Sequence, residues 1–388
     1  MRLLCLLFLL CSASAHAQAP WIDPADDAQH LGPPQPLTWT LQQKVSGFRN
    51  YDKIFPSRDV APSTAPYPLP YKPVDLSGVR FEANGQQLTL DDYFIQRNIA
   101  GLLVIKNGQI VYERYGLGNT AATRWVSYSV AKSVTSMLVG AAIQDGYIDN
   151  IDEKVTDYLP RLRGSAYEQT TIRNLIQMAS GVAWDETYDD PNSDVFIDDW
   201  STLFVQRYLS AKPRVAPPGQ KFNYNTAETN LVGTLLRAAI GNNLATYLSE
   251  KIWQPFGMEA VAKWTLTEAG GGEFGGCCLN ATLRDYARLG LFAMSDGVLP
   301  DGTRALPNGW MDASTAPSPA NEQYGYMWWL QEHGGYAASG IFGQRIYVNP
   351  EERLVVVQHA ALEAAVNAQQ RATQPAMETA LIGALSTR

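Results

Sequence analysis

A serine and a lysine stand three residues apart in the run Ser129-Val130-Ala131-Lys132. On a helix this spacing places both side chains on one face, one turn apart. A buried ammonium group beside a hydroxyl can lose its proton and activate the oxygen as a nucleophile. The alternative is a serine that caps the helix and a solvated lysine, but Lys132 interrupts an apolar run in which a lone charge is costly. The pattern therefore favours Ser129 as a nucleophile and Lys132 as its proton partner.

Two further segments carry groups that could serve such a nucleophile. In residues 217–226, Tyr224 could share a proton with the serine or the lysine, and Thr226 could donate a hydrogen bond. Taken alone, a turn and a helix cap explain these residues better. The glycine-dense residues 334–344 could bring backbone amides close to a ligand, and they are equally compatible with a plain turn before a strand.

The elements that must position these residues follow from hydrophobic periodicity and turn signals. Residues 129–145 predict a buried helix that ends at Gly146, and residues 101–112 predict a hairpin around Asn107-Gly108. Further helices are expected at residues 171–179, 228–240, 244–253 and 285–294, strands at 344–348 and 353–357, and a closing helix at 363–385. Strands near both ends around a helical middle predict an α/β (α+β) fold, an antiparallel sheet flanked by helices with an inserted all-helical lobe.

Three parts are expected along the chain. Residues 1–17 have the positive, apolar and Ala-x-Ala order of a secretory signal with cleavage near Ala17, and their apolar run is too short to span a bilayer. Residues 18–75 are rich in proline and predict an extended N-terminal arm. Residues 76–388 then form the catalytic domain, with a sheet lobe at about 76–145 and 285–388 and a helical lobe at about 146–284. We expect a secreted, periplasmic protein with no stable membrane insertion.

The composition excludes several function classes. The 388 residues include 30 Lys+Arg and 38 Asp+Glu, for a net charge of −8, which argues against a nucleic-acid partner. Four cysteines and four histidines leave little material for a zinc site or a disulfide scaffold. Removal of the signal leaves the neighbours Cys277 and Cys278, which bridge only with strain, so stability must come from the core. No G-x-S-x-G elbow supports Ser-His-Asp chemistry, and we expect no metal and no cofactor.

The sequence resembles the serine β-lactamase and penicillin-binding-protein superfamily in the order of three motifs. These are the S-x-x-K run, Tyr224 with the residues that follow it, and the glycine-dense element before a strand. The surrounding residues are most similar to class C-like β-lactamase-related serine hydrolases, including 6-aminohexanoate-dimer hydrolase and related esterases. The matching stretches are residues 127–133, 178–181, 222–224, 275–276, 284–290 and 324–329. The resemblance covers about Tyr51 to the C-terminus and implies a β-lactamase-like fold.

The resemblance also implies roles for individual residues. Ser129 would be the acylated nucleophile, Lys132 its proton partner and Tyr224 a general acid/base. Whether Lys132 or Tyr224 is the base stays open, because coupled groups titrate as a unit. The backbone amides of Ser129 and Ile341 would form the oxyanion hole. The substrate-binding residues would be Tyr188, which matches a tyrosine that contacts the leaving amine, together with Thr226, Ser339 and Gly340.

The sequence departs from the family pattern at three positions. Thr226 stands where β-lactamases usually carry asparagine, Ala338 replaces the lysine that binds a β-lactam carboxylate, and Phe342 sits where relatives can carry histidine. These changes should reduce the activity of an amidase or esterase less than that of a β-lactamase, because an amidase or esterase needs only the nucleophile, the proton carrier and the oxyanion hole. We therefore expect a secreted serine hydrolase that cleaves a small-molecule amide or ester through an acyl-enzyme on Ser129. The alternatives are a β-lactamase or D,D-peptidase acting on β-lactams or peptidoglycan, and a non-catalytic binding relative of the fold; the oligomeric state is not predicted.

An acidic segment lies around Tyr188. It holds no basic residue and seven acids, namely Asp185, Glu186, Asp189, Asp190, Asp194, Asp198 and Asp199. A solvated loop is the simpler interpretation. The sharper interpretation is a rim that selects amine-bearing substrates.

Overall fold

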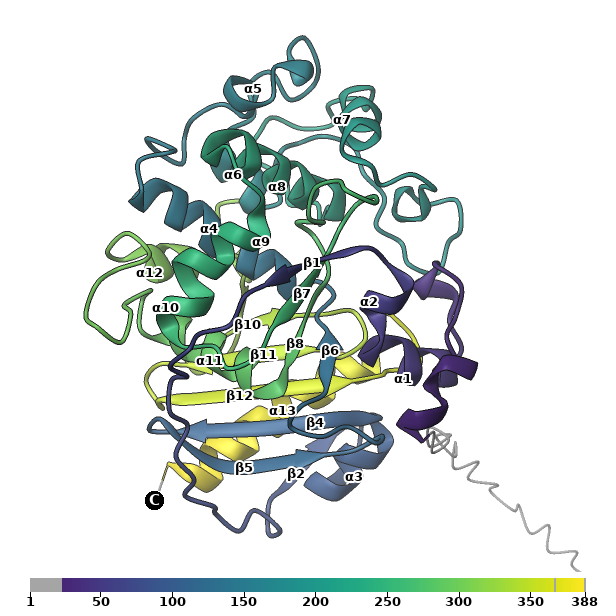
Figure 1. Ribbon diagram of the computed structural model, residues 1–388, viewed down its shortest axis with the longest axis vertical. Helices are drawn as coiled ribbons and strands as arrows, with labels where there is room; N and C mark the ends of the chain where they lie inside the picture. Colours follow the sequence, from purple (N-terminus) through teal and green to yellow (C-terminus); the bar gives the residue numbers. More distant parts are fainter. Residues whose placement is uncertain (1–22, 366–367, 387–388) are drawn as a thin grey trace, which may run out of the picture.

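The computed structural model describes residues 23–365 and 368–386. The predicted signal peptide, residues 1–17, lies outside this range. The centre of the fold is a six-stranded antiparallel sheet in the order β5-β4-β12-β11-β10-β9 (Figure 1). Its strands are β4 (Ile99–Lys106), β5 (Gln109–Tyr115), β9 (Trp329–Leu330), β10 (Tyr336–Ser339), β11 (Arg345–Asn349) and β12 (Leu354–Ala360). Because β4 pairs with β12, strands from both ends of the chain meet in one sheet, as the sequence predicts.

Helices cover both faces of this sheet, and the strands alternate between the two cores. Val355 of β12 packs in the cluster that contains residues of α11 (Leu283–Met294). Its neighbour Val356 packs with Met377 of α13 (Ala368–Leu385) on the opposite face. Successive side chains of a strand point to opposite faces, so each central strand contributes to both hydrophobic cores. The predicted mixed helix and antiparallel-sheet fold is confirmed.

The helical part of the chain lies on one side of the sheet, where Figure 1 shows α5, α6, α7 and α8 above it. Its helices are α4 (Val130–Gln144), α5 (Val155–Tyr158), α6 (Ile172–Ile176), α7 (Thr202–Ser210), α8 (Thr226–Ile240), α9 (Leu244–Leu248) and α10 (Gln254–Phe256), with a π-helical turn at Ser249–Trp253. The helix expected at residues 171–179 is shorter than predicted. It begins with a capping box between Thr171 and Asn174 and stops before Met178, whose φ is 54°.

A second sheet was not predicted. It has the order β1-β7-β8-β6 and consists of β1 (Ser57–Val60), β7 (Ala262–Thr265), β8 (Leu279–Thr282) and β6 (Arg124–Val126). Strands β7 and β8 fall within residues 146–284, so the region expected to be all-helical contains two strands. The sequence Leu279-Asn280-Ala281-Thr282 alternates apolar and polar residues over only four positions, whereas every residue of β8 is buried.

The segment expected as an extended N-terminal arm, residues 18–75, is in fact partly helical. Its described part includes α1 (Leu41–Arg49), α2 (Tyr51–Ile54) and strand β1. A capping box between Thr40 and Gln43 starts α1, and the ion pair between Arg49 and Asp27 is buried with 2.6 Å between Nε and Oδ2. This ion pair joins two parts of the arm, while the pairing of β1 with β7 fastens the arm to the rest of the domain.

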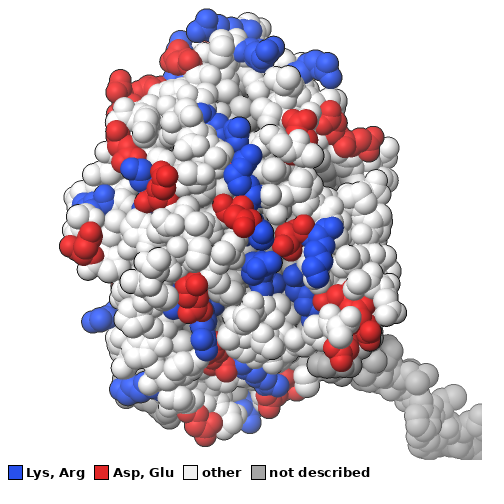
Figure 2. Space-filling model, viewed as in Figure 1, with Lys and Arg blue, Asp and Glu red and all other residues white. Residues whose placement is uncertain are grey.

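The remaining elements complete the surface of the molecule. They are the hairpin strands β2 (Arg80–Ala83) and β3 (Gln86–Thr89), α3 (Leu90–Gln96), α12 (Trp310–Ser314), and short 3-10 helices at Pro24–Gln29, Pro36–Thr38, Pro160–Leu162 and Asp194–Phe196. On the face shown in Figure 2, acidic and basic side chains are interspersed. Among the described helices, none combines the length and the apolar character that a membrane crossing requires.

Candidate active site

Ser129 and Lys132 come together at the start of α4. Ser129 precedes the helix, and its side chain makes no capping hydrogen bond, so the hydroxyl remains available. Lys132 follows one turn later, with its Nζ 3.1 Å from Ser129 Oγ. Ser129 is 8% exposed and Lys132 only 1% exposed. The alternative interpretation, a capping serine with a solvated lysine, does not describe this geometry.

Lys132 has two further hydrogen-bond partners inside the protein. Its Nζ donates to Thr226 Oγ1 at 3.0 Å and to the backbone oxygen of Gly276 at 2.9 Å. Burial lowers the pKa of Lys132 to about 8, and the charge of Glu186 opposes this shift. A buried amine with a lowered pKa can exchange a proton with an adjacent hydroxyl near neutral pH.

Tyr224 lies beside Lys132, two residues before the start of α8. Its ring centroid is 5.1 Å from Lys132 Nζ, and the ring stacks on Trp329 with 5.8 Å between centroids. The next residue, Asn225, caps α8 by accepting a hydrogen bond from Glu228 N at 2.9 Å. The capping interpretation is therefore correct for Asn225, and Tyr224, which precedes the cap, presents its ring to the lysine.

The glycine-rich element approaches the backbone of Ser127, two residues before Ser129. A side chain at Gly340 would place its Cβ 2.7 Å from the carbonyl oxygen of Ser127, so only glycine permits this approach. No oxygen of the described residues accepts a hydrogen bond from the backbone N–H of Ser129 or of Ile341. Both amides are therefore free to donate to another acceptor, which is what an oxyanion hole requires.

Ser339 is held by an arginine from the neighbouring strand. Ser339 ends β10 and pairs in register with Arg345 of β11, and Arg345 Nη1 donates to Ser339 Oγ at 2.9 Å. Arg345 also forms a buried ion pair with Glu378, in which Nη2 lies 2.8 Å from Oε2. A cation thus stands near the position of the missing lysine, but Glu378 neutralises its charge.

A cavity of about 720 Å³ adjoins these groups. Its lining includes three of the four predicted substrate-binding residues, Tyr188, Ser339 and Gly340, together with the predicted Tyr224 and Ile341. Thr226, Ser129 and Lys132 are not among the lining residues. The lining also includes Glu186 and Asp189 of the acidic segment, and residues that were not predicted as site residues, namely Phe222, Gln323, Trp329, Gln331 and Arg345. Phe342 is not among them, because its ring is 1% exposed and packs against Tyr128 with 5.0 Å between centroids.

Glu186, predicted only as one of the seven acids of its segment, has an individual role in the site that the sequence did not predict. Its carboxylate accepts hydrogen bonds from Tyr188 Oη at 2.7 Å, from Thr226 N at 3.1 Å, and from the Thr226 hydroxyl and the Trp184 indole. The sequence carries only part of a signal, the aromatic residues Trp184 and Tyr188; it is the structure that shows Trp184, Glu186 and Tyr188 shielded and the residues between them exposed. This alternation is typical of an extended segment with one face on the protein. The many acidic residues of this segment make the alternation hard to recognise in the sequence.

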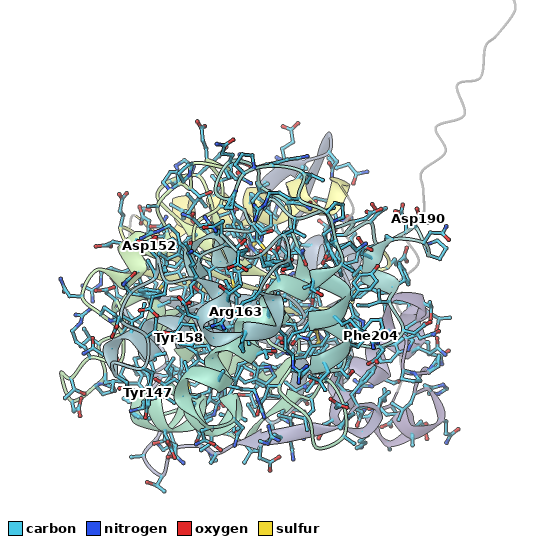
Figure 3. All side chains as sticks on the ribbon, turned by 90° about the horizontal axis from the view of Figure 1, so that it is seen from above. Tyr147, Asp152, Tyr158, Arg163, Asp190 and Phe204 are labelled. Atoms are coloured by element: carbon cyan, nitrogen blue, oxygen red, sulfur yellow. A yellow bond between two sulfur atoms is a disulfide. The ribbon has the colours of Figure 1, made fainter. Side chains whose placement is uncertain are left out.

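The other acidic residues of this segment make different contacts. Asp194 forms an ion pair with Lys212 and accepts a hydrogen bond from Asp185 N at 2.9 Å. Asp199 accepts one from Ser201 N at 2.8 Å. Asp190 lies at the outer edge of the molecule in Figure 3. The segment is therefore neither a plain solvated loop nor a uniform acidic rim.

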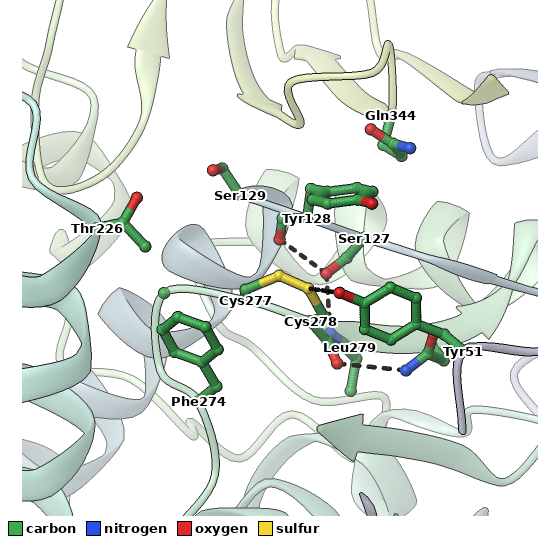
Figure 4. Close-up of a disulfide and its surroundings, with 12 residues drawn as sticks. Tyr51, Ser127, Tyr128, Ser129, Thr226, Phe274, Cys277, Cys278, Leu279 and Gln344 are labelled. Carbon is green, nitrogen blue, oxygen red and sulfur yellow. Dashed lines mark hydrogen bonds between the residues drawn. A yellow bond between two sulfur atoms is a disulfide. The ribbon is translucent and has the colours of Figure 1, made fainter. Parts of the chain in front are cut away.

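The loop from Gly276 to Leu279 fixes the backbone around the nucleophile. The Gly276 carbonyl accepts the lysine hydrogen bond, and Leu279 exchanges two hydrogen bonds with Ser127, each of 2.8 Å. Between these anchors, Cys277 and Cys278 form a disulfide, which Figure 4 shows below the Ser129 and Thr226 side chains. Because this disulfide joins two adjacent residues, it does not connect separate elements of the fold. The stability of the fold therefore comes from its hydrophobic core, as the composition predicts.

Comparisons with known proteins agree with this fold. Residues 89–374 match the family described as beta-lactamase. The 6-aminohexanoate-dimer hydrolase of Paenarthrobacter ureafaciens is 27% identical over 280 residues, which cover 66% of this chain and 70% of that protein. The beta-lactamase of Pseudomonas fluorescens is 26% identical over 183 residues, covering 44% of this chain and 48% of that protein.

Solved structures show the same architecture. A Bacillus anthracis protein, provisionally assigned as a 6-aminohexanoate-dimer hydrolase, has a TM-score of 0.78 at 22% identity and covers 89% of this chain and 95% of its own. A class C beta-lactamase has a TM-score of 0.56 at 17% identity, with 75% and 94% covered. At these identities the likeness concerns the fold alone. Because the family match spans most of the sequence, the chain belongs to the β-lactamase family of hydrolases.

Proposed function

We propose that the protein is a secreted serine hydrolase that cleaves an amide or ester bond of a small molecule through an acyl-enzyme on Ser129. The observation that carries this proposal is the 3.1 Å contact between Ser129 Oγ and the Nζ of the buried Lys132. A buried lysine with a lowered pKa is the kind of group that activates a serine hydroxyl.

The proposed reaction proceeds in two balanced halves. Ser129 Oγ bonds to the carbonyl carbon of the substrate as its proton passes to the Lys132–Tyr224 pair, and the bond to the departing nitrogen or oxygen breaks as that atom receives a proton. Water then attacks the acyl-enzyme by the reverse route. The free N–H groups of Ser129 and Ile341 support a role as donors to the carbonyl oxygen, where negative charge develops.

The substrate side of the cavity favours an amide or ester over a β-lactam. The lysine that would bind a β-lactam carboxylate is replaced by Ala338, and the cation that lies near its place, Arg345, is already paired with Glu378. Tyr188 lines the cavity and is held by Glu186, which supports a role for Tyr188 in contacting the leaving group. The relative named as a 6-aminohexanoate-dimer hydrolase supports the amide reading.

Secretion is part of the proposal and is supported by the N-terminal sequence. Arg2, the apolar residues 3–11 and the motif Ala15-His16-Ala17 have the order of a cleavable signal. N-terminal sequencing of protein recovered from the periplasm should begin at Gln18. A chain that retains Met1 would contradict this part alone.

The catalytic proposal is tested by Ser129→Ala. We expect it to abolish turnover of p-nitrophenyl esters and of short amino-acid amides, and to abolish labelling by a fluorophosphonate, read as intact mass. The matched control is Ser136→Ala, which removes a buried hydroxyl from the same helix; within the described chain this hydroxyl has no hydrogen-bond partner. Turnover that survives Ser129→Ala would refute the proposal, and rapid nitrocefin hydrolysis by the unaltered protein would favour the β-lactamase alternative.

A further inference from the structure

Glu186 reaches Lys132 through a single side chain, that of Thr226. The Thr226 hydroxyl donates to Glu186 Oε1, while Thr226 N donates to Oε2 at 3.1 Å. A hydroxyl has one proton, and a carboxylate can only accept. Tyr188 is also a hydrogen-bonding neighbour of the Thr226 hydroxyl, but its own proton goes to Glu186 and the charged carboxylate is the stronger acceptor. The Thr226 proton therefore goes to Glu186, and Thr226 Oγ1 accepts at its 3.0 Å contact with Lys132 Nζ.

The second neighbour of the amine has an equally fixed role. The Gly276 carbonyl can only accept, at 2.9 Å from Lys132 Nζ. A neutral amine has two N–H bonds and one lone pair. With one N–H directed to Thr226 and the other to Gly276, the lone pair is left for the third contact, which is Ser129 Oγ at 3.1 Å.

We propose that Glu186 is a positioning residue that acts through Thr226 to turn the lone pair of neutral Lys132 toward Ser129, and that Lys132 is thereby the base. This inference rests on the proposed hydrolase function. The Ser129 proton moves to Lys132 Nζ while Ser129 Oγ forms its bond to the carbonyl carbon. The resulting ammonium group then donates to all three neighbours, until its proton passes to the departing atom.

The charge of Glu186 has a second effect, which can be separated from the first. The titratable groups facing Lys132 are Glu186 and Tyr224, and those facing Glu186 also include Tyr188 and Tyr324. Burial lowers the pKa of Lys132 and Glu186 raises it. Loss of the charge alone would therefore lower the pKa of Lys132 and increase the neutral fraction, whereas loss of the orientation would lower the rate even when the lysine is fully neutral.

The decisive variant is Glu186→Gln, examined as a profile of kcat/KM against pH with a p-nitrophenyl ester. The glutamine amide can donate to Thr226 Oγ1, which frees the Thr226 proton to occupy the lysine lone pair. We expect the acidic limb to move to lower pH and the high-pH plateau to fall about tenfold or more, a part of what a general base contributes. A shifted limb with an unchanged plateau would overturn the proposal, because the charge alone would then explain the residue.

Variants of Thr226 test the same link without altering Glu186. Thr226→Val removes the hydroxyl at nearly constant volume and should lower the plateau as Glu186→Gln does. Thr226→Ser retains a hydroxyl and should recover most of the loss. In the double variant Glu186→Gln/Thr226→Val, the two losses should not add, since both break one chain of hydrogen bonds. Additive losses, or an active Thr226→Val, would contradict the proposal.

The matched control is Asp185→Asn, which removes the neighbouring charge. Asp185 is exposed and accepts hydrogen bonds from Thr187, so this variant should keep the profile of the unaltered protein. Fluorophosphonate labelling of Ser129 separates the two proposals. If the unaltered protein is not labelled, the hydrolase proposal fails; if it is labelled and Glu186→Gln keeps its plateau, only the positioning role fails.

Discussion

The carbonyl oxygen of Gly276 lies 2.9 Å from Lys132 Nζ, and the space around Gly276 admits no side chain. A Cβ at this position would be 2.7 Å from the carbonyl oxygen of Thr226, 2.9 Å from Thr226 Cγ2 and 3.5 Å from Lys132 Nζ. The loop that supplies an acceptor to the lysine therefore depends on a glycine. The requirement comes from close packing, since φ at this glycine is not positive.

Gly276→Ala should consequently damage both activity and stability. The methyl group must push away the Thr226 backbone, which also carries the hydroxyl that contacts the lysine, and overpacking of this kind costs about 1–3 kcal/mol. Urea unfolding and ester kinetics measure the two losses. Gly78→Ala is the control, because a Cβ at Gly78 meets no heavy atom within 4 Å. Equal behaviour of the two variants would contradict the packing argument.

The parts of the fold that the sequence predicts well are those set by local signals. The hairpin turn at Asn107-Gly108 adopts positive φ at both residues, 52° and 77°, as a tight hairpin turn requires. The buried helix after Ser129 likewise stops before Gly146, whose φ is 78°. In both cases, neighbouring residues alone determine the geometry, so no knowledge of distant contacts is needed.

The missed features depend on contacts between distant residues. Strand β8 is defined by pairing with β6 and β7, which lie on either side of the helical part. Within the site, Glu186 is 40 residues from Thr226 in the chain, and Arg345 is 33 residues from its partner Glu378. The predicted Ser129 and Lys132 share one helical turn, and for this reason the sequence showed them most clearly. Their catalytic roles remain predictions.

Lys132 should give the folded state a pH-dependent stability. Its pKa is about 8 in the folded protein and 10.5 as an ordinary lysine, so between these values the unfolded chain binds more protons than the folded one. The free energy of unfolding contributed by this group therefore rises as the pH increases from about 8 to about 10.5, by an amount on the order of 3 kcal/mol. The cost of burying the charged lysine is present below pH 8 and relieved above that window.

Comparison of the unaltered protein with Lys132→Met isolates this contribution. Urea unfolding at pH 7.5, 8.5 and 9.5 should show the difference in stability moving in favour of the lysine as pH rises, because tyrosines titrate alike in both proteins. Lys132→Met should also be inactive. Lys53→Met, at an exposed position of α2, provides the control, for which the difference should be flat with pH. A flat difference for Lys132→Met would contradict the lowered pKa.

The ion pair between Arg345 and Glu378 should contribute far more than a surface pair, because both side chains are almost fully enclosed, at 8% and 3% exposure. Glu378→Gln leaves the guanidinium of Arg345 buried beside a neutral group, and removing one partner of a buried pair costs about 3–5 kcal/mol. Since Arg345 also holds Ser339 and Gln331 at the cavity, KM for the ester should rise as well.

The control is Glu352→Gln, whose more exposed ion pair with Lys106 should contribute about 1 kcal/mol or less to stability. Denaturant unfolding measures the loss of stability in each variant. Similar small losses would show that water reaches Arg345. A large loss confined to Glu378→Gln would show that Arg345, the cation near the place of the missing lysine, is paired inside the protein and does not bind a substrate carboxylate.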